Sequence, residues 1–391
     1  MKKILIGLLA MTTLTFVGCD KDDPEDPIAE RTVLIYMAAQ NNLNSYAHYD
    51  LNEIQKGIKN IGNNHLVVYH DRAMQDPVLL HYRNGELCDS VPMDPAAVVC
   101  DPATLKAVAK RVFTDYPAND YGLVLWGHAS GWLFRNDTIA SADARRRAYG
   151  GTNMNGSNYG PGDKWMNIHM LAKALAPLPH LKFIFADCCN MMCAENAYEL
   201  KDVCDYFIGS PAEIPGNGAP YEQILSAMME KELFYQSICD KYALSYDNLV
   251  PLAVVKSSEM VSLADATKKI LQVMKTKDLP AYPDLSNLIY YIDRNLYDMN
   301  HFIKTYATKY DIEAEYLSWK QAFDNAVIYK KFAKRWTTYR NLVNFMDFEM
   351  NEEDFGGMSM FIPQWKLQST DNKNIKLFGW YYAAGYDTIG W

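Results

Sequence analysis

Several motifs by which enzymes are identified from sequence are missing from this chain. It has no GxSxG elbow, no HExxH pair and no glycine-rich phosphate or dinucleotide loop. Their absence argues against an α/β-hydrolase, a common zinc peptidase and a nucleotide-binding enzyme. Positive charge is also scarce: 38 Lys and Arg stand against 47 Asp and Glu, which gives a net charge of −9. Nucleic-acid binding needs clustered cations, so we expect no nucleic-acid partner.

Residues 1–19 have the layout of an export signal rather than of a membrane span. Two lysines precede a short apolar run that contains three threonines, and such a run is too short to cross a bilayer stably. It ends in Phe16-Val17-Gly18-Cys19, which resembles a bacterial lipobox except that Phe16 replaces the usual leucine. In a lipobox the cysteine is lipidated, so we expect a lipid on Cys19; plain signal cleavage is the alternative.

Residues 20–30 follow as an acidic tether that begins DKDDPEDP. Such a segment has nothing to bury and stays extended. An acidic run after a lipid-bearing cysteine resembles the surface-export signal of Bacteroides-type lipoproteins. The resemblance implies a protein that is lipid-anchored to the outer membrane at the cell surface and touches the membrane only through that lipid.

Cysteine usage points to a free thiol. Seven cysteines remain after Cys19, and an odd number in an exported chain leaves at least one thiol without an intrachain partner. Three of them lie in CCNMMC at 188–193, a spacing that does not match zinc-binding CxxC arms, so we expect no metal there. Burial as small apolar side chains would account for Cys88, Cys193, Cys204 and Cys239.

Up to about residue 260, apolar runs of strand length alternate with helical patterns. The strand runs are continuous in hydrophobicity, which indicates a mostly parallel sheet covered on both faces. We therefore predict an α/β domain over 31–260. Its expected strands are 31–39, 65–70, 121–127, 181–186 and 205–210, with a small hairpin near 88–91, and its expected helices are 41–61, 101–116, 167–175 and 195–203.

Residues 261–391 are predicted to form a mainly helical C-terminal region with terminal strands. Apolar residues three and four apart favour helices over 260–275, 285–303 and 312–333, and extended structure is expected over 357–363 and 379–384. Within the first domain, 133–164 has no periodic run and contains Arg145-Arg146-Arg147. A loop of this length in a compact domain is usually functional, so the basic triplet is either a solvated run or a proteolytic processing site.

Two of the expected strands end in reactive residues. The run YGLVLWG leads into His128, and LKFIFA leads into Asp187-Cys188-Cys189. Ligands and catalytic groups gather at the carboxyl ends of parallel strands, so a thiol and an imidazole are expected in one cleft. Residues two apart in an extended segment share a face, so Asp187 and Cys189 should face the cleft while Cys188 points away.

Three segments in this order carry a family resemblance. RTVLIYMAAQNNLNSYAHYDLNEI, LVLWGHASGW and FIFADCCNMM resemble the successive signature segments of clostripain-like cysteine peptidases. GMSMFIP near the C-terminus resembles a weaker element of the same family. The resemblance implies a caspase-like α/β sandwich and a cysteine endopeptidase that acts on protein or peptide substrates.

The resemblance also implies the roles of individual residues. His128 matches the catalytic histidine and Cys189 the nucleophile, although Cys188 stands where the family usually has alanine. The backbone N–H groups of Ala129 or Ser130 and of Cys189 are candidate oxyanion donors. Asp187 either orients the site or caps the end of its strand.

Substrate preference and activation rest on the same resemblance. Family members typically cut after Arg or Lys through an acidic pocket, and SPAEIPGNGAPY at 210–221 resembles the pocket wall, with Glu213 and Asn217 as candidate substrate-binding residues. The protein is expected to be a monomer, or a self-cleaved two-chain form if it cuts its own chain after Arg147. Some relatives are activated by calcium, so calcium stays open as a cofactor, although no DxDxDG-type loop is present.

Two other functions are compatible with parts of the sequence. A surface-exposed binding lipoprotein on an inactive peptidase scaffold would suit the 27 Tyr and 8 Trp, which can stack on sugars. A different thiol acyl-transferase would use the same nucleophile. An inactive scaffold would be expected to lose one member of the Cys–His pair, and both are present.

Overall fold

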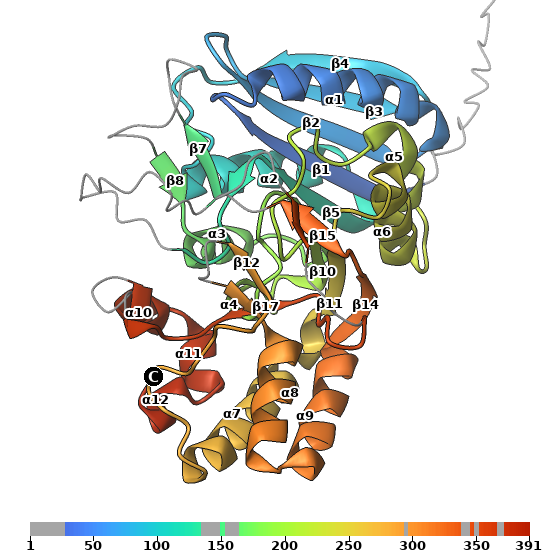
Figure 1. Ribbon diagram of the computed structural model, residues 1–391. Helices are drawn as coiled ribbons and strands as arrows, with labels where there is room; N and C mark the ends of the chain where they lie inside the picture. Colours follow the sequence, from blue (N-terminus) through green and yellow to red (C-terminus); the bar gives the residue numbers. More distant parts are fainter. Residues whose placement is uncertain are drawn as a thin grey trace, which may run out of the picture.

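The computed structural model describes residues 28–133, 149–152, 164–292, 296–337, 345–347, 352–365 and 371–391. Its centre is a nine-stranded sheet in the order β14-β11-β10-β9-β5-β1-β2-β3-β4 (Figure 1). These strands are β1 Ala29–Ala39, β2 His65–Arg72, β3 Val78–Arg83, β4 Glu86–Pro92, β5 Ala118–Trp126, β9 Leu181–Asp187, β10 Cys204–Gly209, β11 Leu252–Lys256 and β14 Val327–Lys331. The α/β fold predicted from the sequence is confirmed.

The middle of the sheet is parallel, and both of its edges are antiparallel. Strands β10, β9, β5, β1 and β2 run in one direction, whereas β3 and β4 at one edge and β11 and β14 at the other alternate in direction. The central strands β1, β5 and β9 are almost wholly buried, as their continuous apolar runs require when both faces are covered.

Helices cover each face of the sheet. One face packs against α1 Asn44–Gly57, α5 Tyr221–Met228 and α6 Phe234–Ser245, and the other against α2 Pro102–Asp115 and α3 Ile168–Leu175. Helix α2 begins as its sequence predicts, because the Asp101 side chain accepts a hydrogen bond from Ala103 N and Pro102 occupies the first turn. Helix α1 begins three residues later than the expected 41–61 helix and is followed by the short 3-10 turn Ile58–Asn60.

The C-terminal region supplies a second layer of helices and one strand of the central sheet. Helices α7 Met260–Thr276, α8 Met299–Tyr310 and α9 Glu313–Ala326 lie together, away from α1 (Figure 1). After α9 the chain enters β14, the edge strand of the large sheet. The chain ends in three short helices, α10 Asp371–Asn374, α11 Gly379–Ala383 and α12 Tyr386–Ile389.

Three sequence predictions in this region are wrong. The expected helix 285–303 is replaced by β12 Tyr290–Ile292 and β13 Leu296–Asp298, and α8 begins only at Met299, where Asp298 caps it. The expected helix 312–333 ends at Ala326, because the apolar pattern continues into β14. Residues 379–383 are helical rather than extended and bury Trp380 against Tyr198.

Small sheets connect the loops around the large one. Strands β6 His128–Ala129, β7 Tyr149–Thr152 and β8 Lys164–Met166 form one of them, and β12, β13 and β17 Ser359–Phe361 form another. A two-stranded sheet pairs β15 Arg335–Thr337 with β16 Phe345–Asp347.

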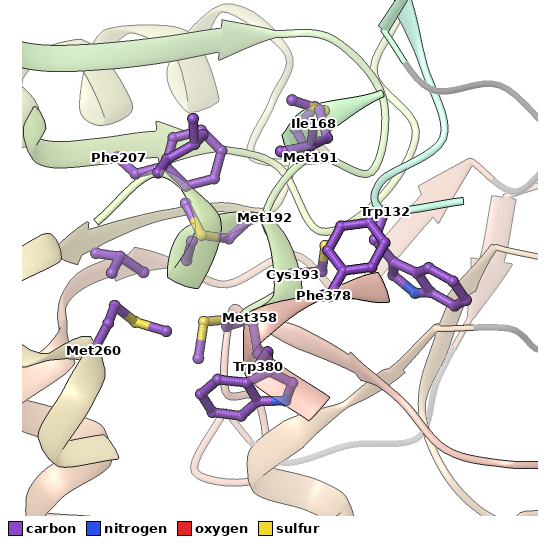
Figure 2. Packing of buried hydrophobic residues seen from close by; sticks show 14 of the residues in the cluster. Trp132, Ile168, Met191, Met192, Cys193, Phe207, Met260, Met358, Phe378 and Trp380 are labelled. Carbon is purple, nitrogen blue, oxygen red and sulfur yellow. The ribbon is translucent and has the colours of Figure 1, made fainter. Parts of the chain in front are cut away.

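Strand β17 also supports the segment that follows the predicted nucleophile. The Ser359 N–H and hydroxyl both donate to Met192 O, at 3.1 and 3.2 Å, and Phe361 N donates to a carboxylate oxygen of Glu195 at 2.9 Å. Glu195 lies in α4 Ala194–Glu199. Figure 2 shows Met192 and Cys193 packed among side chains from distant parts of the chain, including Met260, Met358, Phe378 and Trp380.

Candidate active site

The register of the sheet sets His128 and Cys189 level with each other. Strands β5 and β9 are parallel neighbours, and Trp126 is the register partner of Asp187 at their carboxyl ends. Gly127 N donates to Asp187 O at 3.4 Å, which keeps the two chains together one residue further on. His128 and Cys189 each lie two residues beyond that register pair. The imidazole and the thiol therefore leave the same edge of the sheet from adjacent strands.

Asn42 contacts the imidazole and was not predicted from the sequence. Nε2 of His128 lies 2.9 Å from Oδ1 of Asn42, which follows β1. Since an amide oxygen only accepts, Nε2 carries the proton in this contact and Nδ1 is the basic nitrogen of the neutral ring. His128 itself belongs to β6, where it pairs with Gly150 of β7. The position of the ring thus depends on β6, β7 and the loop after β1.

The two adjacent cysteines occupy opposite environments. Cys189 is partly exposed, and the backbone N–H of Ile214 donates to its Sγ at 3.5 Å. Cys188 is buried, and its thiol donates to Leu125 O at 2.9 Å. Burial raises the pKa of the Cys188 thiol well above its ordinary value, so Cys188 stays protonated. Of the pair, Cys189 has the environment of a reactive thiol.

Residues 190 and 131 join the loop after His128 to the loop after Cys189. Asn190 adopts a left-handed backbone with φ of 60°, and its N–H donates to Ala212 O at 2.8 Å. Gly131 has φ of 65°, and a Cβ on it would lie 2.8 Å from Asn190 O. Only glycine allows this approach. The predicted oxyanion donors Ala129 and Ser130, both buried, lie in the segment that ends at this contact.

Asp187 is buried beneath the loop that follows β10. One of its oxygens accepts from Ala219 N at 3.1 Å and from the Tyr221 hydroxyl at 2.9 Å, and the other from the Tyr242 hydroxyl at 3.4 Å. Burial raises the pKa of Asp187 to about 6, and these donors oppose the rise. The side chain does more than cap its strand, because it fixes the loop beside Cys189.

A second carboxyl group, Asp50 of α1, lies in the same region and was not predicted. Its Oδ2 accepts from the indole N–H of Trp126 at 2.6 Å, while its buried Oδ1 has no hydrogen-bond partner among the residues that the structure describes. Burial and then the charge of Asp187 raise the pKa of Asp50 to about 9. Asp50 could not be predicted because the sequence of an amphipathic helix does not show which of its polar residues will contact the end of a strand.

The predicted substrate-binding residues occupy the loop after β10. Glu213 is partly exposed and immediately precedes Ile214, whose N–H contacts Cys189. Asn217 is exposed beside the buried Gly218. Asp205, by contrast, pairs with Lys182 at 3.0 Å at the amino end of β10, at the opposite end of the strand from the site.

Other predictions fall outside these contacts. Cys19 and Arg147 lie outside the described residues. Cys193, Cys204 and Cys239 are buried as expected, but Cys88 is exposed on the edge strand β4 and is not a core residue. No cluster of three or more His, Cys, Asp or Glu side chains in the described ranges could hold a metal ion. In the same ranges, no helix has the length and apolar character to span a membrane.

Comparison with known proteins agrees with this geometry. The sequence model of the clostripain family matches residues 35–376. A secreted C11 cysteine protease from Bacteroides thetaiotaomicron, solved in complex with an irreversible peptide inhibitor, is 29% identical with a TM-score of 0.77, over 92% of this chain and 100% of that one. An inactive zymogen C11 protease from Parabacteroides distasonis is 29% identical with a TM-score of 0.76, over 92% and 99%.

A B. fragilis cysteine protease is 32% identical with a TM-score of 0.52, over 58% of this chain and 96% of that one. No curated protein matches the sequence. The family match spans most of the chain, and two C11 protease structures cover nearly all of it. The chain therefore belongs to the clostripain family of cysteine peptidases.

Proposed function

We propose that this peptidase hydrolyses peptide bonds after Arg or Lys, with Cys189 as nucleophile and His128 as its acid–base partner. The observation that carries the proposal is their level position beyond the register pair of Trp126 and Asp187. A thiol and an imidazole from adjacent strands are the two groups that thiol catalysis needs.

The reaction follows from the contacts of these two side chains. With Nε2 bonded to Asn42, Nδ1 of His128 takes the thiol proton of Cys189. The Ile214 N–H beside Sγ stabilises the thiolate. The thiolate attacks the scissile carbonyl carbon, and the imidazolium then protonates the leaving amine. Water hydrolyses the resulting acyl-enzyme and restores both groups.

The oxyanion of the tetrahedral intermediate requires preorganised donors. The backbone N–H groups of Ala129 or Ser130 and of Cys189 are the proposed donors. The tight approach of Gly131 to Asn190 O supports this assignment, because it holds the two donor segments at a fixed separation.

Selection of a cationic P1 side chain is supported by two buried carboxyl groups at this edge of the sheet. Asp50 and Asp187 are both buried, and within the described chain neither carboxyl group forms an ion pair with Lys or Arg. A guanidinium or ammonium group from the substrate would supply the missing cation. Glu213 and Asn217 would line the rim of this pocket.

Processing and anchoring complete the proposal. Cleavage after Arg147 would give a two-chain form of the monomer, and a lipid on Cys19 would hold it at the outer surface of the outer membrane. Residues 31–260 would form the peptidase domain, to which 261–391 adds an edge strand. No step of this mechanism requires calcium.

The experiment is a fluorogenic panel of peptides ending in Arg, Lys, Asp, Asn or Leu, assayed on the wild type, Cys189→Ala and Cys188→Ala. We expect hydrolysis after Arg or Lys that Cys189→Ala abolishes and Cys188→Ala retains. Gel electrophoresis and N-terminal sequencing would show whether wild type, but not Cys189→Ala, is cut after Arg147. Silence of correctly folded wild type on every peptide, with and without calcium, would favour the binding lipoprotein instead.

A further inference from the structure

Asp50 and Asp187 come from different parts of the fold and meet at one place. Trp126 and Asp187 are register partners on neighbouring parallel strands, so their side chains lie on the same face of the sheet. Helix α1 covers that face, and its Asp50 accepts the indole N–H of Trp126 at 2.6 Å. The bond draws Asp50 over the end of β9, beside Asp187.

Tyrosine hydroxyl groups surround the two carboxyl groups. Tyr221 of α5 donates to Asp187. Burial and then the charges of Asp187 and Asp50 raise the pKa of Tyr221. Burial and then the charges of Asp187 and Asp50 raise the pKa of Tyr246, which directly follows α6. Its hydroxyl donates to Gly218 O at 2.8 Å. A Cβ on Gly218 would lie 2.8 Å from Asp187 Oδ2. The carboxyl pair therefore lies under the same 214–219 loop that contacts Cys189.

One oxygen of this pair accepts no hydrogen bond from any residue that the structure describes. This atom is Oδ1 of Asp50, and Asp50 itself is 0% exposed. A buried acceptor of this kind is costly unless a ligand or a proton satisfies it. Oδ1 of Asp50 is therefore the acceptor of this pair that a ligand could satisfy.

The charged neighbours do not supply a cation. Within the described chain, the titratable groups that act on the pair or on the tyrosines around it are Tyr49 and Glu53 of α1, Cys189 after β9, Tyr221 of α5, Tyr242 of α6 and Tyr246 directly after α6. All of them are neutral or negative. Lys56 acts on Glu53 but pairs in solvent with Glu222 at 3.3 Å.

Two carboxylates this close cannot both stay ionised in an apolar surrounding. The pair lowers its energy by keeping a proton on the member that accepts fewer hydrogen bonds, here Asp50. An incoming cation favours the ionised form of Asp50 instead, because the cation stabilises both carboxylates at once. The proton then leaves Asp50 for solvent, and the carboxylate and the cation form the new ion pair.

We propose that Asp50 is a second specificity-determining residue, which binds a cationic P1 side chain together with Asp187 and releases its proton to solvent as that side chain enters. The inference rests on the proposed function. It identifies Asp50 as the residue that makes the preference of the enzyme for a charged P1 side chain depend on pH. Citrulline has nearly the shape of arginine but no charge, so it should enter without displacing the proton.

The test compares peptides with P1 Arg and P1 citrulline on wild type, Asp50→Asn and the control Asp115→Asn. Asp115 lies on α2 and is exposed. In wild type the Arg-to-citrulline ratio of kcat/KM should rise as the pH is raised from 6 to 9. We expect Asp50→Asn to lower kcat/KM for Arg roughly 10- to 100-fold, to leave citrulline unchanged and to flatten the ratio against pH. Asp115→Asn should behave as wild type.

Proton release gives an independent measurement that needs no variant. Binding of a reversible P1 Arg inhibitor to wild type, followed by calorimetry in two buffers of different ionisation enthalpy, should release protons, whereas the citrulline inhibitor should release none. An unchanged ratio in Asp50→Asn, or equal proton release by both inhibitors, would overturn the inference. If wild type cleaves neither peptide although iodoacetamide alkylates Cys189, the proposed function fails, and this inference with it.

Discussion

Nε2 of His128 lies 2.9 Å from Oδ1 of Asn42, so a residue from the loop after the first strand determines which ring nitrogen can act as a base. The contact joins the loop after β1 to β6, the short strand that follows β5. It also explains how an imidazole on a two-residue strand keeps one orientation.

Replacing Asn42 should therefore disturb catalysis more than folding. In Asn42→Ala the ring loses its acceptor, so we expect kcat to fall on the order of 10- to 100-fold with little change in KM. The acidic limb of the pH–rate profile should shift as well, because the imidazolium loses a hydrogen-bond partner. Kinetics from pH 5 to 9 would measure both effects.

The matched control is Asn119→Ala, whose exposed amide bonds Glu30 at the other end of the sheet. It should leave the profile unchanged. Equal losses in kcat for both variants, or an unshifted profile in Asn42→Ala, would remove Asn42 from the positioning of His128.

Cysteine alkylation should separate the reactive thiol from the exposed one. Cys88 is exposed, Cys189 is only partly exposed, and the remaining described cysteines are buried. At pH 6 we expect iodoacetamide to modify Cys189 faster than Cys88, because the Ile214 N–H and the imidazole of His128 favour its thiolate. Peptide mass spectrometry over time gives both rates.

His128→Ala should remove the advantage of Cys189 at pH 6 and leave the rate at Cys88 unchanged. If accessibility alone decided, Cys88 would react first in every variant, and an activated thiol at 189 would be ruled out.

Gly131 offers a direct test of the junction between the two catalytic loops. In Gly131→Ala the new methyl group would meet Asn190 O at 2.8 Å in addition to the strained φ of 65°. We expect a loss of about 2–4 kcal/mol in the free energy of unfolding and a lower kcat, because the histidine and cysteine loops are pushed apart. Urea unfolding and steady-state kinetics measure the two effects.

Gly62→Ala is its matched control, since Gly62 has φ of 60° but nothing within 4 Å of the added Cβ. It should cost only about 1 kcal/mol and leave kcat unchanged. Similar stability losses in the two variants would mean that the approach to Asn190 contributes nothing.

Stability should depend on pH through Glu195, which is buried against β17. Burial raises the pKa of Glu195 to about 7, above its ordinary 4.5 in an unfolded chain. The folded state therefore holds the proton more tightly, and its contribution to stability is lost as the pH rises from about 4.5 through 7. Between pH 5 and 8, the Tm of Glu195→Gln should fall less than that of wild type.

The amide in Glu195→Gln keeps an acceptor for Phe361 N but cannot ionise. The control is Glu259→Gln, a partly exposed carboxylate that pairs with Lys256 of β11 at 3.2 Å. It should follow the wild-type pH dependence, and parallel curves for all three proteins would show that Glu195 does not ionise in this range.

The reactive ends of two strands could be predicted from sequence because the signal is local. Continuous apolar runs marked β5 and β9, and His128 and Cys189 follow them directly. Asn42 and Asp50 could not be found in this way, because Asn42 contacts His128 86 residues away and Asp50 contacts Trp126 76 residues away. Their local sequence is that of an ordinary loop and an ordinary helix.

The C-terminal errors have a similar physical origin. Helical spacing over 285–303 is compatible with a helix, but tertiary pairing of Leu296 with Phe361 of β17 makes part of it a strand. At 379–383 the aromatic run favours a strand by propensity, yet burial of Trp380 decides for a helix. In both cases distant partners override local preference.

The support of Met192 and Glu195 by β17 spans more than 160 residues of chain. Contacts of such long sequence separation form late, because the intervening chain must first be ordered. While the protein is being synthesised, the segment after Cys189 lacks the support of β17 until residue 361 has emerged. We expect a chain stopped short of that point to be inert, so that proteolytic activity appears only when synthesis is almost finished.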